Sequence, residues 1–283
     1  MIISKITGGL GNQMFQYAIA KSIATVRNDI FKLDTTAYET YKLHNGYRLN
    51  AFSLEVSLAK EDEIFRLRGF DNRIFNKLNF FKPKSYYLEK ERTIYDDKVF
   101  SYKDIYLDGY WQNEAYFLDI RKSLLEDFKL NKMLSPKAEA SLLNIKSSSG
   151  ISVHVRRGDY LKHPEIGILS VDYYKRAIEY MKGKVENPQF FIFSNDIPWC
   201  KENFSFIKEV TYIEESESEL EDLELMKSCH HNIVANSSFS WWGAWLNDYK
   251  EKIVIAPKQW MAINPKNYKW SPNSWIEIST MEA

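Results

Sequence analysis

Two adjacent arginines, Arg156 and Arg157, are the side chains with the clearest chemical potential in this sequence. They follow an apolar, alternating stretch at 151–155 and precede Gly158 and Asp159, a pattern typical of a strand that ends in a charged loop. Guanidinium groups bind phosphate oxygens two at a time and stay charged. The stretch therefore predicts an anion site, with phosphate as the expected anion, beyond the carboxyl end of a strand.

Three further predicted strands end in polar residues, and each is followed by a helical pattern. They are 189–193 with Ser194, Asn195 and Asp196, then 210–213 with the acidic run 214–222, then 233–235 with Asn236, Ser237 and Ser238. Strands that alternate with helices form a parallel sheet, and the carboxyl ends of its strands meet at one edge. Open α/β sheets bind their ligands at that edge. The strand ends that we expect there are marked by His154, Ser194, Glu214 and Asn236.

Each strand end also has a purely structural interpretation. Residues 194–196 can serve as a helix cap, and the acidic run suits the positive end of a helix dipole. His154, between two valines, is typical of a buried core histidine. The tryptophans at 241, 242 and 245 favour helix packing over stacking on a sugar. The convergence of four strand ends carries the argument for a site.

A glycine-rich loop near the N-terminus is a second candidate site. Residues 1–6 predict a strand, Gly8, Gly9 and Gly11 form the loop, and a helix is predicted from Met14 to about Arg27. A strand over 30–33 then ends at Asp34. This layout is typical of a nucleotide-binding unit whose helix N-terminus faces a phosphate.

An NAD-binding fingerprint is the competing interpretation of the same loop. Gly9 and Gly11 match its first two glycines, and Asp34 stands at a suitable distance for a ribose contact. Met14 replaces the third glycine. A purely structural turn stays open as well.

The remaining N-terminal sequence is less regular. A helix is predicted over 54–68, and the basic-aromatic segment 75–84 suits either contact with a membrane or glycan or an irregular, partly buried segment. A strand at 105–108 leads into an aromatic turn and then a helix through Phe128. Pro136 and the serine-rich stretch 147–150 favour a boundary between lobes, which we expect between residues 145 and 146.

Composition excludes several classes of partner. The chain has 283 residues, with 38 basic and 38 acidic side chains, so no global charge attracts nucleic acid. Its two cysteines form no disulfide framework, which favours a reducing, cytoplasmic setting. We also expect no signal peptide and no transmembrane segment.

Four motifs together resemble the inverting α-1,2-fucosyltransferases of glycosyltransferase family 11. They are Gly8 to Ala18 (Gly-Gly-Leu-Gly-Asn-Gln-Met-Phe-Gln-Tyr-Ala), His154 to Tyr160 (His-Val-Arg-Arg-Gly-Asp-Tyr), Phe193 to Asp196 (Phe-Ser-Asn-Asp) and Asn236 to Leu246 (Asn-Ser-Ser-Phe-Ser-Trp-Trp-Gly-Ala-Trp-Leu). The resemblance implies an α/β fold of GT-B type, with two Rossmann-like lobes and the active site in the cleft between them. Residues 1–145 would form the acceptor-side lobe with the glycine loop, and residues 146–283 the lobe that binds the donor.

The resemblance also implies a reaction. The donor would be GDP-fucose, and the acceptor would be the 2-hydroxyl of a terminal β-galactoside, free or lipid-linked. The setting would be bacterial surface polysaccharide synthesis, O-antigen or capsule, in the cytoplasm or peripherally at the inner face of the inner membrane. No cofactor is implied. The sequence also has no Asp-x-Asp triplet and no cluster with metal-ligand spacing, so we expect a metal-independent enzyme.

The same resemblance implies roles for individual residues. Arg156 would hold the β-phosphate with support from Arg157, while His154 and Asp222 would contact the guanosine. Ser237, Ser238 and Phe239 would meet the pyrophosphate, and Gly11 and Asn12 would close over the phosphates or the fucose. Donor contacts are also expected from Gly9, Gln13, Ser194 and Asn195. The catalytic candidates are Arg156, Asp159 and His154, and the general base stays open.

Two other functions remain to be tested against this one. A Rossmann oxidoreductase would use the first glycine loop and Asp34 to bind NAD(P). A non-catalytic glycan-binding protein would use the aromatic residues, which make up 15% of the chain.

Overall fold

The computed structural model describes residues 1–40, 45–69, 83–214, 216–262 and 269–280. The chain divides into two compact units, Met1–Asn131 and Lys132–Ala283. This division precedes the expected boundary between 145 and 146, because helix α5 (Pro136–Lys146) packs against helix α8 (Glu219–Ser228). Ile145 at the end of α5 is buried in a cluster with Phe191 and Leu225 of the second unit.

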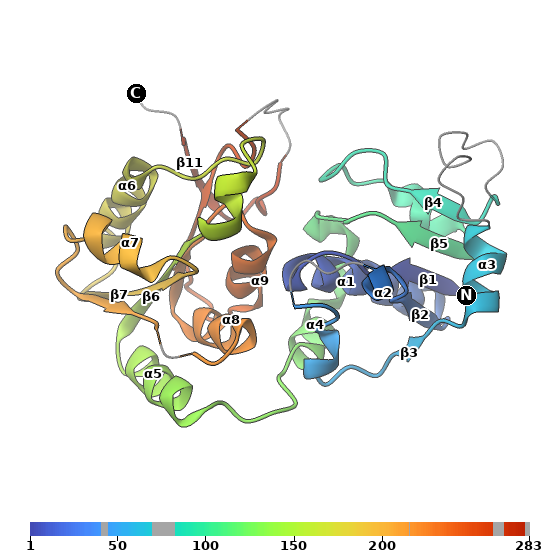
Figure 1. The fold of residues 1–283 in the computed structure, drawn as a ribbon, viewed down its shortest axis with the longest axis horizontal. Coiled ribbons are helices and arrows are strands. Elements are labelled where there is room, and N and C mark those ends of the chain that lie inside the picture. Colours follow the sequence, from blue (N-terminus) through green and yellow to red (C-terminus); the bar gives the residue numbers. More distant parts are fainter. Residues whose placement is uncertain (41–44, 70–82, 215, 263–268, 281–283) are drawn as a thin grey trace. The chain divides into compact units, whose positions relative to one another are not determined.

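The described part of the first unit contains a five-stranded parallel sheet of order β3-β2-β1-β5-β4 (Figure 1). The strands are β1 (Ile2–Lys5), β2 (Phe31–Asp34), β3 (Ser57–Leu58), β4 (Tyr86–Leu88) and β5 (Ile105–Asp108). The helices are α1 (Leu10–Arg27), α2 (Ala37–Thr40), α3 (Glu61–Arg68) and α4 (Arg121–Asp127). Successive residues of β1 face opposite sides: Ile3 packs with α3, and Ser4 donates to the carbonyl of Gln16 in α1.

Two N-terminal elements differ from the sequence-based expectation. Helix α1 begins at Leu10 rather than Met14, with Gly9 as its cap. The helix expected over 54–68 forms only from Glu61, because residues 57–58 pair with β2 as strand β3. Most of the basic-aromatic segment 75–84 lies outside the described residues.

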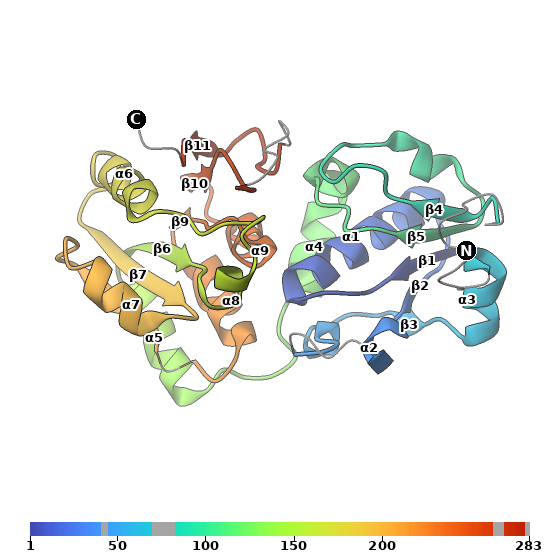
Figure 2. The same cartoon turned by 45° about the horizontal axis from the view of Figure 1, so that its top comes forward.

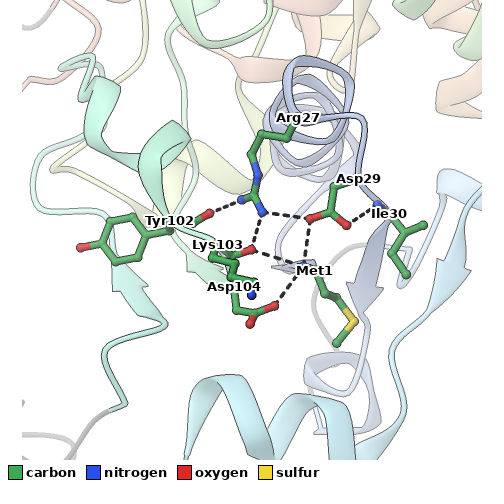
Figure 3. A network of polar contacts seen from close by, with 7 residues as sticks. All are labelled: Met1, Arg27, Asp29, Ile30, Tyr102, Lys103 and Asp104. Carbon is green, nitrogen blue, oxygen red and sulfur yellow. Dashed lines mark hydrogen bonds and ion pairs between the residues drawn. The ribbon is translucent and has the colours of Figure 1, made fainter.

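A polar network fixes the amino-terminal end of β1 (Figure 3). The α-ammonium group of Met1 lies 3.0 Å from carboxylate oxygens of both Asp29 and Asp104. Arg27, at the end of α1, pairs with Asp29 at 2.9 Å and donates to the carbonyls of residues 102 and 103. These bonds join α1, the start of β2 and the segment before β5, at the end of the sheet opposite the glycine loop.

The described part of the second unit contains a six-stranded parallel sheet of order β11-β10-β9-β6-β7-β8 (Figure 2). The strands are β6 (Ser149–Val155), β7 (Pro188–Ser194), β8 (Val210–Tyr212), β9 (His231–Ile233), β10 (Val254–Pro257) and β11 (Ile276–Ile278). Beside α5 and α8, the helices are α6 (Val171–Lys182), α7 (Ile197–Asn203) and α9 (Ser238–Leu246). Counted from β6 as strand 1, the order is that of a Rossmann fold, 3-2-1-4-5-6, and it reverses between β6 and β9.

Strand β7 shows why both faces of this sheet are covered. Phe190 and Ile192 are buried in the cluster beneath α6 and α7, whereas Phe191 and Phe193 are buried against α5 and α8. Figures 1 and 2 show α6 and α7 on one side of the sheet and α8 and α9 on the other. Both faces are apolar, as expected of a parallel sheet. The expected strands at 151–155 and 189–193 and the helix over 171–182 are confirmed.

In the described part of the chain, no helix is both long and apolar enough to span a bilayer.

Candidate functional site

The point at which the strand order reverses in the second unit lies between the carboxyl ends of β6 and β9. Arg156 follows β6 directly and leads into a 3-10 turn, Gly158–Lys162. Ser237 caps α9 shortly after β9 ends. Sheets of this order bind ligands in the crevice at this point. The loop that carries Arg156 and the turn before α9 are therefore neighbours in space, as predicted from the alternation of strands and helices.

The guanidinium of Arg156 is held on one side and has donors left on another. One terminal nitrogen lies 2.8 Å from the carboxylate of Asp159, and the guanidinium carbon lies 5.5 Å from the centre of the Tyr160 ring. Its Nε atom is buried and finds no hydrogen-bond partner among the described residues. A buried donor of this kind is normally satisfied by a ligand or water. Arg156 is thus a preorganised cation with capacity to bind an anion.

Arg157 is occupied differently. Its Nε donates to the Asp196 carboxylate at 3.2 Å, and its guanidinium carbon lies 3.8 Å from the centre of a Trp199 ring. Its backbone N–H donates to the side chain of Asn195 at 3.1 Å. These contacts fasten Arg157 to the start of α7, and its support of a bound donor stays a prediction.

The end of β7 shapes the loop that carries Arg156. The Asp196 carboxylate accepts from the N–H of Trp199 and caps α7, so the capping interpretation is confirmed for this residue. Asn195 accepts from Arg157 and donates to Asp159 at 3.4 Å. A Cβ atom on Gly158 would lie 2.4 Å from the Asn195 amide nitrogen, so only glycine fits here without displacing that side chain. The Ser194 hydroxyl accepts from the N–H of Asp196 at 2.9 Å.

His154 is buried at the end of β6 and is neutral at physiological pH. Burial, and then the charge of Arg156, lower the pKa of its imidazole from 6.5 to about 3, although Asp159 opposes the shift. Its Nδ1 has no hydrogen-bond partner among the described residues, and its ring centre lies 5.7 Å from that of Phe239. A neutral imidazole can donate a hydrogen bond to a ligand or accept one from it, but it offers no positive charge to a phosphate.

Asp222, in the first turn of α8, is half-buried and has a buried carboxylate oxygen, Oδ1. Burial raises the pKa of its carboxyl to about 6, although a hydrogen bond with Ser216 lowers it. Its Oδ1 finds no hydrogen-bond partner within the described residues. The neighbouring Glu221 accepts from the backbone N–H groups of Ser135 and Glu217, each at 2.7 Å. Glu221 therefore stabilises the fold through these two backbone N–H groups, whereas the Oδ1 of Asp222 can still accept a hydrogen bond.

The start of α9 offers N–H donors. The Ser237 hydroxyl accepts from the N–H of Phe239 at 3.4 Å, and Ser238 opens the helix. The tryptophans that follow are buried in the unit, with exposed fractions of 2%, 0% and 3% for Trp241, Trp242 and Trp245. Helix packing is therefore the confirmed interpretation of the tryptophans, and they offer no face to a sugar.

Asn236, one of the strand ends expected at this edge, is joined here by Tyr160, to which the sequence assigned no role. The Tyr160 hydroxyl donates to the carbonyl of Asn236 at 3.2 Å. The side-chain nitrogen of Asn236 donates to the carbonyls of Ile166, Gly167 and Trp260. The available signal was the position of Tyr160 four residues after Arg156, since a helical turn at that spacing brings two side chains together.

In the first unit, the glycine loop and the start of α1 are held by internal bonds. Gly8 has a φ of 82°, in the left-handed region, and a Cβ there would lie 2.8 Å from the Asn12 amide nitrogen. Gln13 is fully buried, donates to the carbonyls of Gly8 and Gly46, and accepts from the N–H of Arg48. Asn12 accepts from the Gln112 amide at 2.9 Å. Contacts of Gly9, Gly11, Asn12 and Gln13 with a donor stay a prediction.

Asp34 does not support the NAD interpretation. Its carboxylate is 1% exposed, accepts from the N–H and hydroxyl of Thr36 and from the hydroxyl of Tyr106, and pairs with Arg68 at 3.5 Å. A ribose hydroxyl would have to displace these partners. The competing NAD interpretation of Asp34 is therefore not supported, for a physical reason that the spacing alone does not show.

Comparison with known proteins assigns the family. The sequence pattern of glycosyl transferase family 11 matches residues 1–278. The chain belongs to glycosyltransferase family 11. An α-1,2-colitosyltransferase of Escherichia coli is 37% identical over 98% of this chain and 99% of its own length. The O-antigen biosynthesis glycosyltransferase WbnK of Escherichia coli is 31% identical over 97% of this chain and 99% of its own length.

A human relative and two solved structures extend the comparison. Human galactoside α-(1,2)-fucosyltransferase 1 is 26% identical over 84% of this chain and 63% of its own length. The fucosyltransferase NodZ from Bradyrhizobium aligns with a TM-score of 0.51 at 15% identity, over 86% of this chain and 91% of its own. Arabidopsis thaliana FUT1, in a mutant form bound to GDP, aligns with a TM-score of 0.50 at 12% identity, over 89% of this chain and 69% of its own. The two parallel-sheet units and this likeness confirm the GT-B-type α/β fold of this family 11 glycosyltransferase.

Proposed function

We propose that this family 11 glycosyltransferase is a galactoside α-1,2-fucosyltransferase. It moves L-fucose from GDP-β-L-fucose to the 2-hydroxyl of a terminal β-galactoside, with inversion at the anomeric carbon. The observation that carries the proposal is the placement of Arg156 at the point of strand-order reversal shared with the start of α9, with a buried Nε that has no partner among the described residues. That placement suits a diphosphate leaving group.

The chemistry explains why a cation and N–H donors are needed together. Fucosyl transfer builds positive charge on the sugar ring and negative charge on the departing diphosphate, as in glycoside cleavage. Fixed donors that face developing negative charge are worth most where they need no rearrangement. Arg156 binds the β-phosphate, while the hydroxyl groups of Ser237 and Ser238 bind the remaining phosphate oxygens at the start of α9.

Asp222 and His154 form the base-binding part of the proposed donor site. A guanine ring presents N–H donors on its Watson–Crick edge, and a carboxylate is an acceptor-only group that matches them. The Oδ1 of Asp222, which has no partner in the described part of the chain, supplies such an acceptor, and neutral His154 supplies a hydrogen bond without charge.

Asp159 is assigned to orientation of Arg156 rather than to proton removal. Its carboxylate pairs with Arg156 at 2.8 Å and accepts from Asn195 at 3.4 Å. These two contacts hold the carboxylate beside the guanidinium, which suits an orienting role. A strongly dissociative transition state needs little assistance from a base, so transfer can proceed without a dedicated general base.

A second donor follows from one specific observation. The relative that is 37% identical over nearly the whole chain is an α-1,2-colitosyltransferase. Colitose is therefore the alternative sugar at the same site, with the same α-1,2 linkage. The name of the second Escherichia coli relative, the O-antigen biosynthesis glycosyltransferase WbnK, supports O-antigen synthesis as the setting for either donor.

The test is incubation of the protein with GDP-fucose and lactose, followed by mass spectrometry of the sugar product and measurement of released GDP. The expected product is lactose carrying one added fucosyl residue, with one GDP released per transfer. A parallel reaction contains GDP-colitose in place of GDP-fucose. Absence of fucosylated product across a panel of β-galactosides would overturn the proposal, and a colitosylated product in that case would support the second donor.

A further inference from the structure

The turn that follows β6 brings an aromatic ring under the guanidinium of Arg156. Tyr160 lies in the 3-10 turn Gly158–Lys162, and its ring centre is 5.5 Å from the guanidinium carbon of Arg156. A guanidinium over an aromatic face is attracted by the ring quadrupole, more strongly where water is excluded. The ring thus contacts the cation from one side while Asp159 binds it from another.

The hydroxyl of the same residue reaches across the reversal point. It donates to the backbone carbonyl of Asn236 at 3.2 Å and shares a hydrogen bond with the Ser237 hydroxyl. Ser237 is the cap of α9, so Tyr160 contacts both parts of the proposed anion site. The ring contact with Arg156 and the hydroxyl contacts at 236–237 are present together in the structure.

Asn236 anchors the far end of this connection. Its side-chain nitrogen donates to the carbonyl of Trp260 at 3.1 Å and to that of Gly167 at 3.2 Å. These bonds hold the turn before α9 to two other loops of the second unit. The carbonyl that receives the Tyr160 hydroxyl is therefore a fixed point.

We propose that Tyr160 is a positioning residue that sets the Arg156 guanidinium at a fixed distance from the first turn of α9. It acts through two contacts, the ring beneath Arg156 and the hydroxyl bonded at 236–237. The inference rests on the proposed function in one respect: the anion that these two parts hold is taken to be the diphosphate of GDP.

A matched control exists on α6. The Tyr173 hydroxyl donates to the carbonyl of Val234 at 2.8 Å, which is the same type of bond to the same connection between β9 and α9. Tyr173 is fully buried in the core cluster beneath α6. Its loss should lower stability through the same kind of hydrogen bond without altering Arg156.

The experiment compares Tyr160→Phe, Tyr160→Leu and Tyr173→Phe with the native protein. Calorimetry gives the affinity for GDP, steady-state kinetics give kcat and KM, and thermal melting gives stability. We expect Tyr160→Phe to weaken GDP binding about three- to ten-fold and Tyr160→Leu about a hundred-fold, because the first loses one hydrogen bond and the second also loses the ring. We expect kcat to fall in the same order, with the KM for the acceptor unchanged. Tyr173→Phe should lower the melting temperature and leave GDP affinity within two-fold.

A readout independent of the nucleotide keeps the two proposals separate. The Nε–H signal of Arg156, assigned by its loss in Arg156→Lys, should show a reduced heteronuclear NOE in Tyr160→Leu and a native value in Tyr173→Phe. If the native protein bound no GDP, the proposed function would fail, and this signal alone would decide the role of Tyr160. Native GDP affinity and native Arg156 mobility in both Tyr160 variants would overturn the inference, as would equal effects of Tyr160→Phe and Tyr173→Phe on GDP affinity.

Discussion

The guanidinium groups of Arg156 and Arg157 leave β6 in succession and meet different neighbours. Arg156 meets Asp159 and Tyr160 and retains a buried donor, whereas Arg157 is enclosed by Asp196 and Trp199. Arginine and lysine differ most where a planar, multi-donor group is required. Substitution by lysine should therefore mainly reduce activity at position 156 and mainly reduce stability at position 157.

We expect Arg156→Lys to reduce kcat/KM at least about a hundred-fold, because lysine presents one point charge where the diphosphate needs several fixed donors. Its melting temperature should stay close to the native value. Arg157→Lys should instead destabilise the protein by about 1–3 kcal/mol through loss of its bond to Asp196 and its contact with Trp199. Kinetics and thermal melting of both variants provide the measurement. A native rate in Arg156→Lys would contradict the assignment.

At Asp222, the expected effect is a pH dependence of nucleotide binding. Its folded-state pKa is raised to about 6, so its contribution to folding is present below the unfolded pKa and is lost as pH rises through 6. Guanine binding favours the charged form. We therefore expect GDP affinity to weaken about ten-fold between pH 7 and pH 5, since a proton must then be released on binding.

The Asp222→Asn variant is the control for that pH dependence. Both proteins are measured with the same GDP, so protonation of its phosphates contributes equally to the two pH profiles. A difference between the proteins in the slope of GDP affinity against pH is therefore due to Asp222. We expect the variant to bind GDP more weakly at pH 7 and to show a shallower dependence on pH. Parallel pH profiles for the two proteins would argue against a guanine contact at this carboxylate.

At the scale of the elements, the loops at the carboxyl ends of strands β6 and β7 stabilise each other. The Asn195 side chain bonds to the Arg157 N–H and to Asp159, and Gly158 leaves the space that this side chain occupies. We expect Gly158→Ala to displace the Asn195 amide, to cost about 1–2 kcal/mol of stability and to lower turnover, because the loop bearing Arg156 loses its support.

A double-mutant comparison identifies the contact responsible. Once Asn195→Ala has removed the amide, adding Gly158→Ala should cost much less, so the two effects should be less than additive in thermal melts and in kcat. Gly183→Ala is the matched control, because a Cβ there meets nothing closer than 3.5 Å. Full additivity of the Gly158 and Asn195 substitutions would contradict the proposed contact.

The sequence predicted the elements of the second unit better than those of the first. Strands β6 and β7 are buried on both faces and lie between clear helical patterns, so their limits could be read to within about two residues. The sequence predicted a late start for helix α1, because Gly11 and Asn12 are poor helix formers and resemble a loop. The helix in fact begins before them, at Leu10. The pairing of residues 57–58 with β2 is a tertiary contact, and no local pattern predicted it.

The candidate site shows the same division between what is local and what is long-range. The alternation of strands and helices predicted that the polar strand ends meet at one edge, and the structure places Arg156 and Ser237 at that edge. The bond between Tyr160 and Asn236 joins residues 76 positions apart and depends on the order of the strands. Likewise, the partners that occupy Asp34 could not be inferred from its distance to the glycine loop.

At the scale of the whole molecule, the source of charge for the leaving group can be tested without any mutation. Since Arg156 and the first turn of α9 are proposed to meet the negative charge of the diphosphate, added metal should be unnecessary. We expect transfer rates after extensive dialysis against a chelator to stay within about two-fold of the untreated rate. Loss of activity that is restored by a divalent cation would contradict this proposal.

The most direct test of the proposed α-1,2-fucosyl transfer is the linkage that the native protein forms. NMR spectroscopy of the product of GDP-fucose and lactose should show an α-configured fucose attached to O2 of the galactose, which is the outcome of inversion from the β-linked donor. A β-configured product, attachment at another hydroxyl, or no transfer to any β-galactoside would contradict the proposed reaction.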